Sequence, residues 1–165
     1  MRRRSPAGET GLTVVELLVT ISLLAVLGGL GLTALQRYAW TQEHQGTAEE
    51  VVSTLRDVAQ RSLSEGRTYC VAFDTGADAW TVYRRQCSTS SGTVVDGAVR
   101  ARGTVRIDSP SFTPADPTVA CPAAGTCAYF YPRGTGSPGS VQILRDGSAP
   151  ITVSVEGLTG HVSPS

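Results

Sequence analysis

The chain has 165 residues, and its 14 basic side chains, all of them arginine, are balanced by 14 acidic ones, so the formal net charge is zero. This length accommodates one small globular domain of about 100 residues beside a long helix. A balanced charge argues against a surface devoted to nucleic acid, because such a surface needs a clear excess of basic residues.

Residues 11–35 form an apolar run with a single acidic residue, Glu16, near its start. The 19 positions from Leu17 to Leu35 carry no charge. At a rise of about 1.5 Å per residue, a helix over these positions extends about 28 Å, close to the hydrocarbon thickness of a bilayer. A carboxylate inside a membrane costs about 2.5–3.5 kcal/mol, so Glu16 needs a partner unless it lies at the headgroup boundary. The run predicts a transmembrane helix.

The residues around Glu16 form a signature. A short basic leader, MRRRSPAGET, precedes Gly11, and four residues beginning with Leu12 and Thr13 separate this glycine from Glu16. The arrangement resembles the class III signal of type IV pilins and type II secretion pseudopilins. The resemblance implies that a prepilin peptidase cuts between Gly11 and Leu12 and that the new amino terminus of Leu12 is methylated. Glu16 would be the fifth residue of the trimmed chain and would act in assembly together with Thr13. Leu12 departs from the Phe that usually stands at this position.

Other targeting signals fit the amino-terminal sequence less well. A secretory signal peptide has an apolar core of about 7–15 residues followed by a small-x-small cleavage site, whereas this run is longer and contains an acid. The arginines at positions 2–4 are not followed by the rest of a twin-arginine signal. An uncleaved single-span anchor is the remaining alternative. By the positive-inside rule, these arginines would lie in the cytoplasm and the bulk of the chain outside.

Residues 36–66 are predicted to continue the helix. Apolar and small residues recur at helical spacing and form one stripe, which contains Ala48, Val51, Val52, Leu55, Val58, Ala59, Ser62 and Leu63. Gly66 is a natural stop, because glycine adopts the left-handed conformation at a helix end without steric cost. The apolar run and this segment together predict one helix of about 50 residues, whose second half packs on the globular domain.

Strands are predicted beyond the helix, and short runs of β-branched and aromatic residues mark them. Residues 68–74 and 79–85 form a predicted hairpin, in which one of Trp80 and Tyr83 enters the core because the two side chains lie on opposite faces. Further strands are expected at 93–95, 104–107, 129–131, 141–144, 151–155 and 161–162. Four prolines predict a long loop after Asp108.

The four cysteines, Cys70, Cys87, Cys121 and Cys127, all lie beyond the apolar run. An even number of cysteines in an exported domain suggests disulfides, and four cysteines allow three pairings. The sequential pairing, Cys70 with Cys87 and Cys121 with Cys127, closes two short loops and is the expected one. A zinc site is the alternative, but the spacings are not C-x2-C, and the two histidines lie far away in the sequence. We therefore expect neither metal nor cofactor.

The part of the chain beyond the apolar run resembles the GspH/FimT family of minor pseudopilins and minor pilins. The matching stretches are the helix AEEVVSTLRDVAQRSLSEGR leading into TYCVAFD, the strand AWTVY, the segment FYPRGTGSPGSVQIL and the terminal VSVEGLTGHV. The resemblance implies an α+β pilin-like fold, in which a long amino-terminal helix packs on a small antiparallel β-sheet head. The expected organisation is a leader at 1–11, a transmembrane assembly helix at 12–35, its amphipathic continuation at 36–66 and a β-rich head at 67–165.

The implied function is that of a structural subunit of a type IV pilus or a type II secretion pseudopilus. Its expected partners are other pilin or pseudopilin subunits, the prepilin peptidase, the assembly platform in the cytoplasmic membrane and membrane lipid. Its head would lie outside the cytoplasm, and after assembly the subunit would lie in the filament. The sequence predicts no enzyme, because neither histidine has a patterned nucleophile partner and the glycine-rich 134–139 stretch lacks the Lys-Ser/Thr of a phosphate loop.

Two alternatives come from other classes of protein. The first is a DNA-binding minor pilin for DNA uptake, since some relatives are thought to contact DNA through basic residues near the carboxyl terminus. Here only Arg133 and Arg145 lie close to that end, which disfavours phosphate binding. The second is a membrane-anchored exported β domain that never polymerises.

Overall fold

The computed structural model describes residues 13–88, 90–116, 118–123 and 125–165, apart from the side chains of 28–37 and 39. Its only helix within these residues is α1, Val14–Glu65, a single helix of 52 residues as the sequence predicts. The helix ends at the predicted stop: Gly66 adopts a φ of 62°, and the backbone N–H of Arg67 bonds to the Ser62 carbonyl at 3.2 Å. This six-to-one bond is the Schellman closure that satisfies one of the last free carbonyls of a helix.

The chain forms two compact units, Met1–Trp40 and Thr41–Ser165. The first unit contains the amino-terminal part of α1. The second contains the last 25 residues of that helix, 41–65, together with every strand that the structure describes. The second half of the helix therefore belongs to the head, because its apolar stripe needs the sheets to cover it.

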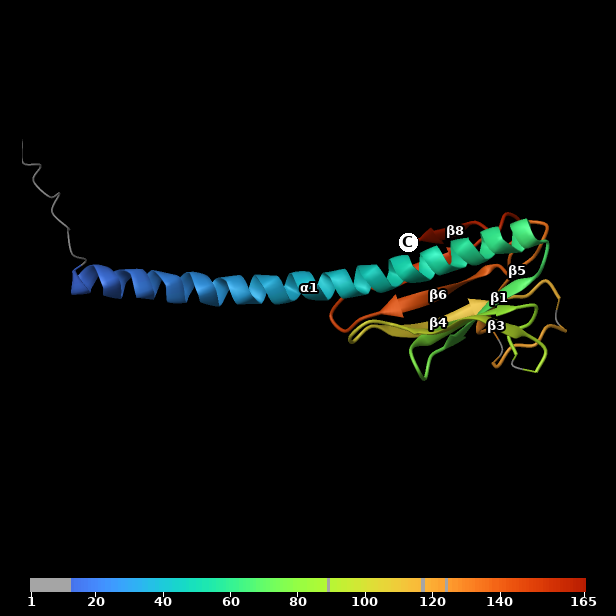
Figure 1. Ribbon diagram of the computed structural model, residues 1–165, viewed down its shortest axis with the longest axis horizontal. Coiled ribbons are helices and arrows are strands. Elements are labelled where there is room, and N and C mark those ends of the chain that lie inside the picture. The colour runs from blue at the N-terminus through green and yellow to red at the C-terminus, as the bar shows by residue number, and fades with distance from the viewer. Residues whose placement is uncertain (1–12, 89, 117, 124) are drawn as a thin grey trace, which may run out of the picture. The chain divides into compact units, whose positions relative to one another are not determined.

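The head contains two four-stranded antiparallel sheets (Figure 1). The strands are β1 Tyr69–Asp74, β2 Ala79–Arg84, β3 Thr93–Arg100, β4 Arg106–Phe112, β5 Cys127–Phe130, β6 Gly139–Leu144, β7 Ile151–Val155 and β8 Val162–Pro164. The first sheet has the order β3-β2-β1-β5 and the second the order β4-β6-β7-β8. With residues 41–65 of α1 packed on them, the two sheets give the α+β pilin-like arrangement expected from the sequence.

One hydrophobic core joins α1 to both sheets. The stripe residues Val51, Leu55 and Val58 are completely buried, and they pack with inward-facing side chains of β1, β2, β5, β6 and β7. Trp80 is 1% exposed in this core, whereas Tyr83 packs on the opposite face of the same sheet. The expectation that one of these two aromatic residues enters the core is confirmed, and the alternation of side chains along β2 explains which one.

Two local expectations need correction. The long loop expected after Asp108 begins four residues later than predicted, because β4 continues to Phe112; the described residues between Phe112 and Cys127 contain no strand, as expected. The pairing with β6 is irregular between Asp108 and Ser111, so Pro110 lies where no ladder N–H is required. Leu63, expected in the buried stripe, is 54% exposed, and its Cδ2 lies beside Gly134 at the rim of the head.

Candidate assembly site

The amino-terminal end of α1 carries the candidate assembly residues. Gly11 and Leu12, the predicted cleavage and methylation positions, lie outside the described residues. Thr13 is the N-cap of the helix: its Oγ1 accepts a hydrogen bond from the Glu16 backbone N–H at 3.2 Å, and its carbonyl accepts from Leu17 N–H at 3.1 Å. A Thr followed by Glu three residues later is the capping-box pattern. Glu16 therefore lies in the first helical turn, where the helix dipole favours a negative charge.

The surface of α1 near its start is apolar on every side. Ten large apolar side chains are at least half exposed: Val14, Val15, Leu17, Leu18, Val19, Ile21, Leu23, Leu24, Val26 and Leu27. The two hydroxyl side chains among them bond to carbonyls of the same helix, Thr20 Oγ1 to Leu17 at 2.9 Å and Ser22 Oγ to Leu18 at 2.8 Å. A hydroxyl that donates to a carbonyl of its own helix needs no partner from the solvent, which suits an apolar environment. Exposed apolar surface on this scale indicates a site that another molecule covers.

Within the described residues, no helix has a stretch long and apolar enough to cross a membrane.

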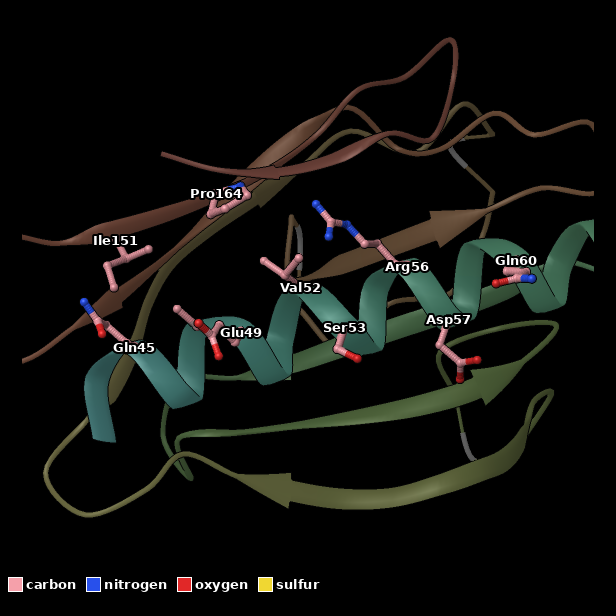
Figure 2. A pocket seen from close by; sticks show the side chains of 10 residues that line it. Gln45, Glu49, Val52, Ser53, Arg56, Asp57, Gln60, Ile151 and Pro164 are labelled. Atoms are coloured by element: carbon pink, nitrogen blue, oxygen red, sulfur yellow. The ribbon is translucent and has the colours of Figure 1, made fainter. Parts of the chain in front are cut away.

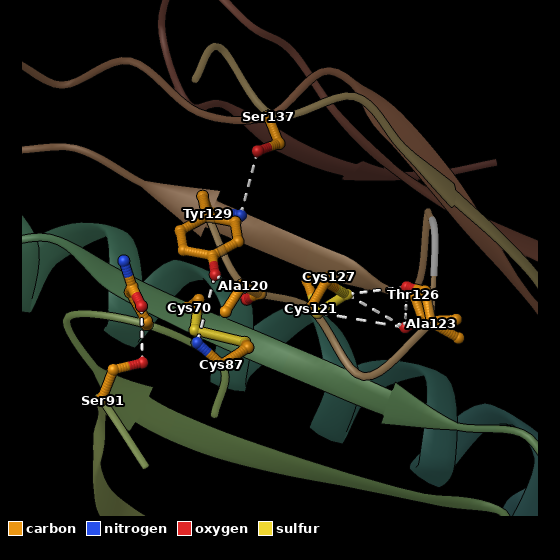
Figure 3. The surroundings of a disulfide bond; sticks show 11 residues. Cys70, Cys87, Ser91, Ala120, Cys121, Ala123, Thr126, Cys127, Tyr129 and Ser137 are labelled. Carbon is orange, nitrogen blue, oxygen red and sulfur yellow. Dashed lines mark hydrogen bonds between the residues drawn. A yellow bond between two sulfur atoms is a disulfide. The ribbon is translucent and has the colours of Figure 1, made fainter. Parts of the chain in front are cut away.

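The outer face of the first sheet carries both disulfides. Cys70 bonds to Cys87 and Cys121 bonds to Cys127, which is the sequential pairing (Figure 3). The first joins β1 to the segment after β2, and the second holds the loop that leads into β5. Together with Tyr129, these bonds form a second, smaller buried cluster. The cross-links replace a larger core on this face of the sheet, as expected for a small domain.

The Tyr129 hydroxyl is the polar centre of this smaller cluster. It accepts a hydrogen bond from the Cys87 backbone N–H at 3.1 Å and donates one to the Ala120 carbonyl (Figure 3). Burial raises the pKa of the Tyr129 phenol, and the hydrogen bond from Cys87 lowers it in part. One side chain thus ties two loops to β5. This role of Tyr129 was not predicted from the sequence. The signal available there was the two-residue spacing of Tyr129 and Tyr131, which places both side chains on the same side of an extended chain.

A groove of about 700 Å³ lies between α1 and the edge of the second sheet (Figure 2). Val52 and Ile151 contribute apolar wall, and Glu49 and Asp57 also line the groove. The edge strand β8 is closed to further pairing in two ways. Arg56 donates from Nη2 at 2.9 Å and from Nε at 3.3 Å to the Val162 carbonyl, and Pro164 has no N–H to offer. These features protect an edge strand from adding a foreign strand.

The histidines do not form a metal site. His44 is buried on α1 and its Nε2 lies 2.9 Å from the Ile143 carbonyl, so this nitrogen is the donor. His161 is exposed in the turn before β8. Among the described residues, no group of three or more His, Cys, Asp or Glu side chains could hold a metal ion.

The fold is similar to that of solved minor pilin and pseudopilin structures. The minor pseudopilin EpsH of the type II secretion system of Vibrio cholerae is 13% identical, over 74% of this chain and 93% of that chain, with a TM-score of 0.55. A second crystal structure, of the type IV minor pilin FimU of Pseudomonas aeruginosa, is 15% identical over 78% of this chain and 92% of that chain, with a TM-score of 0.54. At these identities the likeness concerns the fold.

No curated protein matches the sequence. The family described as "Type II transport protein GspH" matches residues 47–159, which include the buried half of α1 and the head as far as the turn before β8. This stretch is more than half of the chain, and the chain therefore belongs to the GspH family.

Proposed function

We propose that the chain is a minor pseudopilin or minor pilin, a structural subunit of a type II secretion pseudopilus or a type IV pilus. The observation that carries this proposal is the amino-terminal part of α1, whose large apolar side chains are exposed on all sides. The fold and family of the head support it. The proposed role is structural, with other subunits as partners and no catalytic step.

The proposed assembly mechanism uses two charges at one helix end. Cleavage after Gly11 would give Leu12 a free amine. Leu12 directly precedes the N-cap Thr13 and stands near Glu16 in the sequence. We propose that the amine of one subunit pairs with Glu16 of a neighbouring subunit. In an apolar environment each charge offsets the desolvation of the other, and removal of one partner leaves a buried charge that costs about 3–5 kcal/mol. Apolar contacts allow two neighbouring helices to slide along each other, whereas an ion pair between them fixes one axial register.

The proposed location follows from the same segment. A helix over 12–35 would hold the subunit in the cytoplasmic membrane with the head outside, until the assembly platform extracts it into the filament. The prepilin peptidase would remove 1–11 and methylate Leu12. The amphipathic continuation at 36–66 and the head at 67–165 would then form the part of the subunit that meets other head domains.

Two measurements test this proposal. Mass spectrometry of the mature protein should show a methylated amino terminus at Leu12. Glu16→Ala should leave this cleavage intact and reduce the amount of the subunit in sheared or cross-linked filaments at least tenfold, while Glu49→Ala, which removes an exposed acid from the head portion of the same helix, should not. An untrimmed chain would support the anchored-domain alternative. Normal incorporation of Glu16→Ala would refute the ion-pair mechanism.

A further inference from the structure

Two exposed aromatic side chains lie on α1 beyond its apolar surface. Tyr38 is 65% exposed and Trp40 is 49% exposed, and both belong to the same compact unit as the start of the helix. The exposed side chains that follow directly, Thr41 and Gln42, are polar. On the described part of the helix, the exposed surface is therefore mainly apolar before the aromatic pair and polar directly after it. Tyrosine and tryptophan combine an apolar ring with one polar atom, which suits a boundary between hydrocarbon and water.

Tyr38 and Trp40 lie on opposite sides of the helix at nearly the same height. Each helical residue turns the chain by about 100° and advances it by about 1.5 Å, so the two are about 200° apart around the axis and about 3 Å apart along it. A neighbouring protein helix covers one side, and its contacts recur three and four residues apart. A bilayer surrounds the helix, so aromatic side chains at one depth can point in any direction. The placement of the pair therefore favours a lipid interface over a protein partner.

Glu16 lies about one bilayer thickness away from this pair. Residue 39, the midpoint of the pair, is 23 positions after Glu16, which corresponds to about 35 Å along the helix. Bilayer hydrocarbon is about 30 Å thick, and the headgroup layers extend it to about 40–45 Å. A tilt of about 20° shortens the 35 Å to about 33 Å, which still exceeds the hydrocarbon thickness. When the aromatic pair lies in one headgroup layer, Glu16 therefore lies in the other.

We propose that Tyr38 and Trp40 bind the outer headgroup layer of the cytoplasmic membrane and that Glu16 of the same subunit lies in the inner headgroup layer. This inference rests on the membrane location in the proposed function. It adds that the Glu16 carboxylate is hydrated before assembly, so the unassembled subunit needs no partner for it. The carboxylate enters an apolar environment only in the filament, where the amine of a neighbouring subunit reaches it.

The first measurement locates Trp40. The full chain is placed in phosphatidylcholine vesicles at a low protein-to-lipid ratio, so that subunits do not meet. The chain has two tryptophans, and Trp80→Phe makes Trp40 the only fluorescent one. Trp40→Phe is the matched control, because its remaining Trp80 is 1% exposed in the core of the head. Lipids that carry a spin label in the headgroup should quench Trp40 at least threefold more strongly than lipids labelled near the methyl end of the acyl chain. Neither label should quench Trp80.

The second measurement leaves the core of the head unchanged. All four natural cysteines are paired in disulfides, so a cysteine introduced on the helix is the only thiol. Val14→Cys and Gln42→Cys place this thiol at the two headgroup layers, and Leu27→Cys places it midway between them; all three natural side chains are exposed. A water-soluble maleimide is present on both sides of the vesicles, and each rate is divided by the rate in denaturing detergent. Val14→Cys and Gln42→Cys should react at similar rates, and Leu27→Cys at least tenfold more slowly.

The outcomes separate this proposal from the proposed function. Strongest quenching of Trp40 by the methyl-end label, or none by either label, would overturn the interfacial placement of the aromatic pair. A reaction of Val14→Cys as slow as that of Leu27→Cys would place Glu16 in the hydrocarbon and overturn the proposal, while the membrane location would stand. A fast reaction of Leu27→Cys would contradict the membrane location as well. Loss of cleavage or of filament incorporation with the expected depth profile would refute the assembly mechanism alone.

Discussion

Tyr129 in β5 and Tyr131 just after this strand have stacked rings, but removal of their hydroxyl groups should have opposite effects on stability. Tyr129 Oη bonds to the Cys87 N–H and the Ala120 carbonyl, so Tyr129→Phe leaves one buried and one partly buried backbone group without this partner. At about 1 kcal/mol for each bond, the expected loss of unfolding free energy is about 2 kcal/mol. Tyr131 Oη is buried without a partner, and Tyr131→Phe removes this desolvation cost while keeping the stacked ring. The expected gain is about 1 kcal/mol.

Thermal unfolding of the full chain in detergent, followed by near-ultraviolet circular dichroism, measures both effects. For a chain of this size, Tyr129→Phe should lower the melting temperature by about 4–8 °C and Tyr131→Phe should raise it by about 2–4 °C. Both variants delete one oxygen atom from a tyrosine of the same stacked pair, so each serves as the control for the other. A loss of stability in Tyr131→Phe would show that its hydroxyl already has a partner. Equal shifts of the same sign would refute the hydrogen-bond argument for both residues.

Two further predictions concern the same face of the sheet. Replacing both Cys70 and Cys87, which are 17 residues apart, with alanine should cost about 3 kcal/mol of unfolding free energy. Replacing Cys121 and Cys127, six residues apart, should cost about 2 kcal/mol, because the disulfide that closes the longer loop removes more entropy from the unfolded chain. Denaturant unfolding of the two double variants checks this order. Since burial raises the folded-state pKa of Tyr129 above the ordinary value of about 10, its contribution to stability is complete below pH 10 and is lost as the pH rises toward the folded pKa. Melting temperatures measured from pH 9 upward should fall less steeply in Tyr129→Phe than in the unsubstituted chain.

The sequence predicts those parts of the fold that depend on local periodicity. The helix, its stop at Gly66 and the β1–β2 hairpin follow from spacing and from the conformational preference of glycine. The continuation of β4 past Asp108 does not, because Pro110 opposes a strand locally and only the pairing with β6 accommodates it. Leu63 fits the helical period, but it remains 54% exposed at the end of the helix. Local propensity is a weak guide wherever a tertiary contact decides the outcome.

The pocket between Arg67, Arg85 and Tyr131 was not predictable from the sequence for a different reason. Its residues come from three separate segments of the chain. Only the antiparallel register of β1 with β2 and with β5 brings them together. The unpartnered state of the Tyr131 hydroxyl is also a property of the folded chain. Glu16, in contrast, could be singled out from the sequence, because a charge in an apolar run is unusual without any knowledge of the fold.

The two units of the chain carry interactions of different physical kinds. Apolar side chains distributed around a helix attract any apolar neighbour, so the amino-terminal unit supplies affinity without choosing a partner or a register. One carboxylate in that unit can set a register, because a buried ion pair tolerates little displacement. Partner choice requires groups that a wrong neighbour leaves unsatisfied, and such groups discriminate strongly when they are polar. In the described part of the head, Arg67 and Arg85 are exposed and form no ion pair, so they are groups of this kind. Affinity and selectivity in this subunit would therefore reside in different units of the chain.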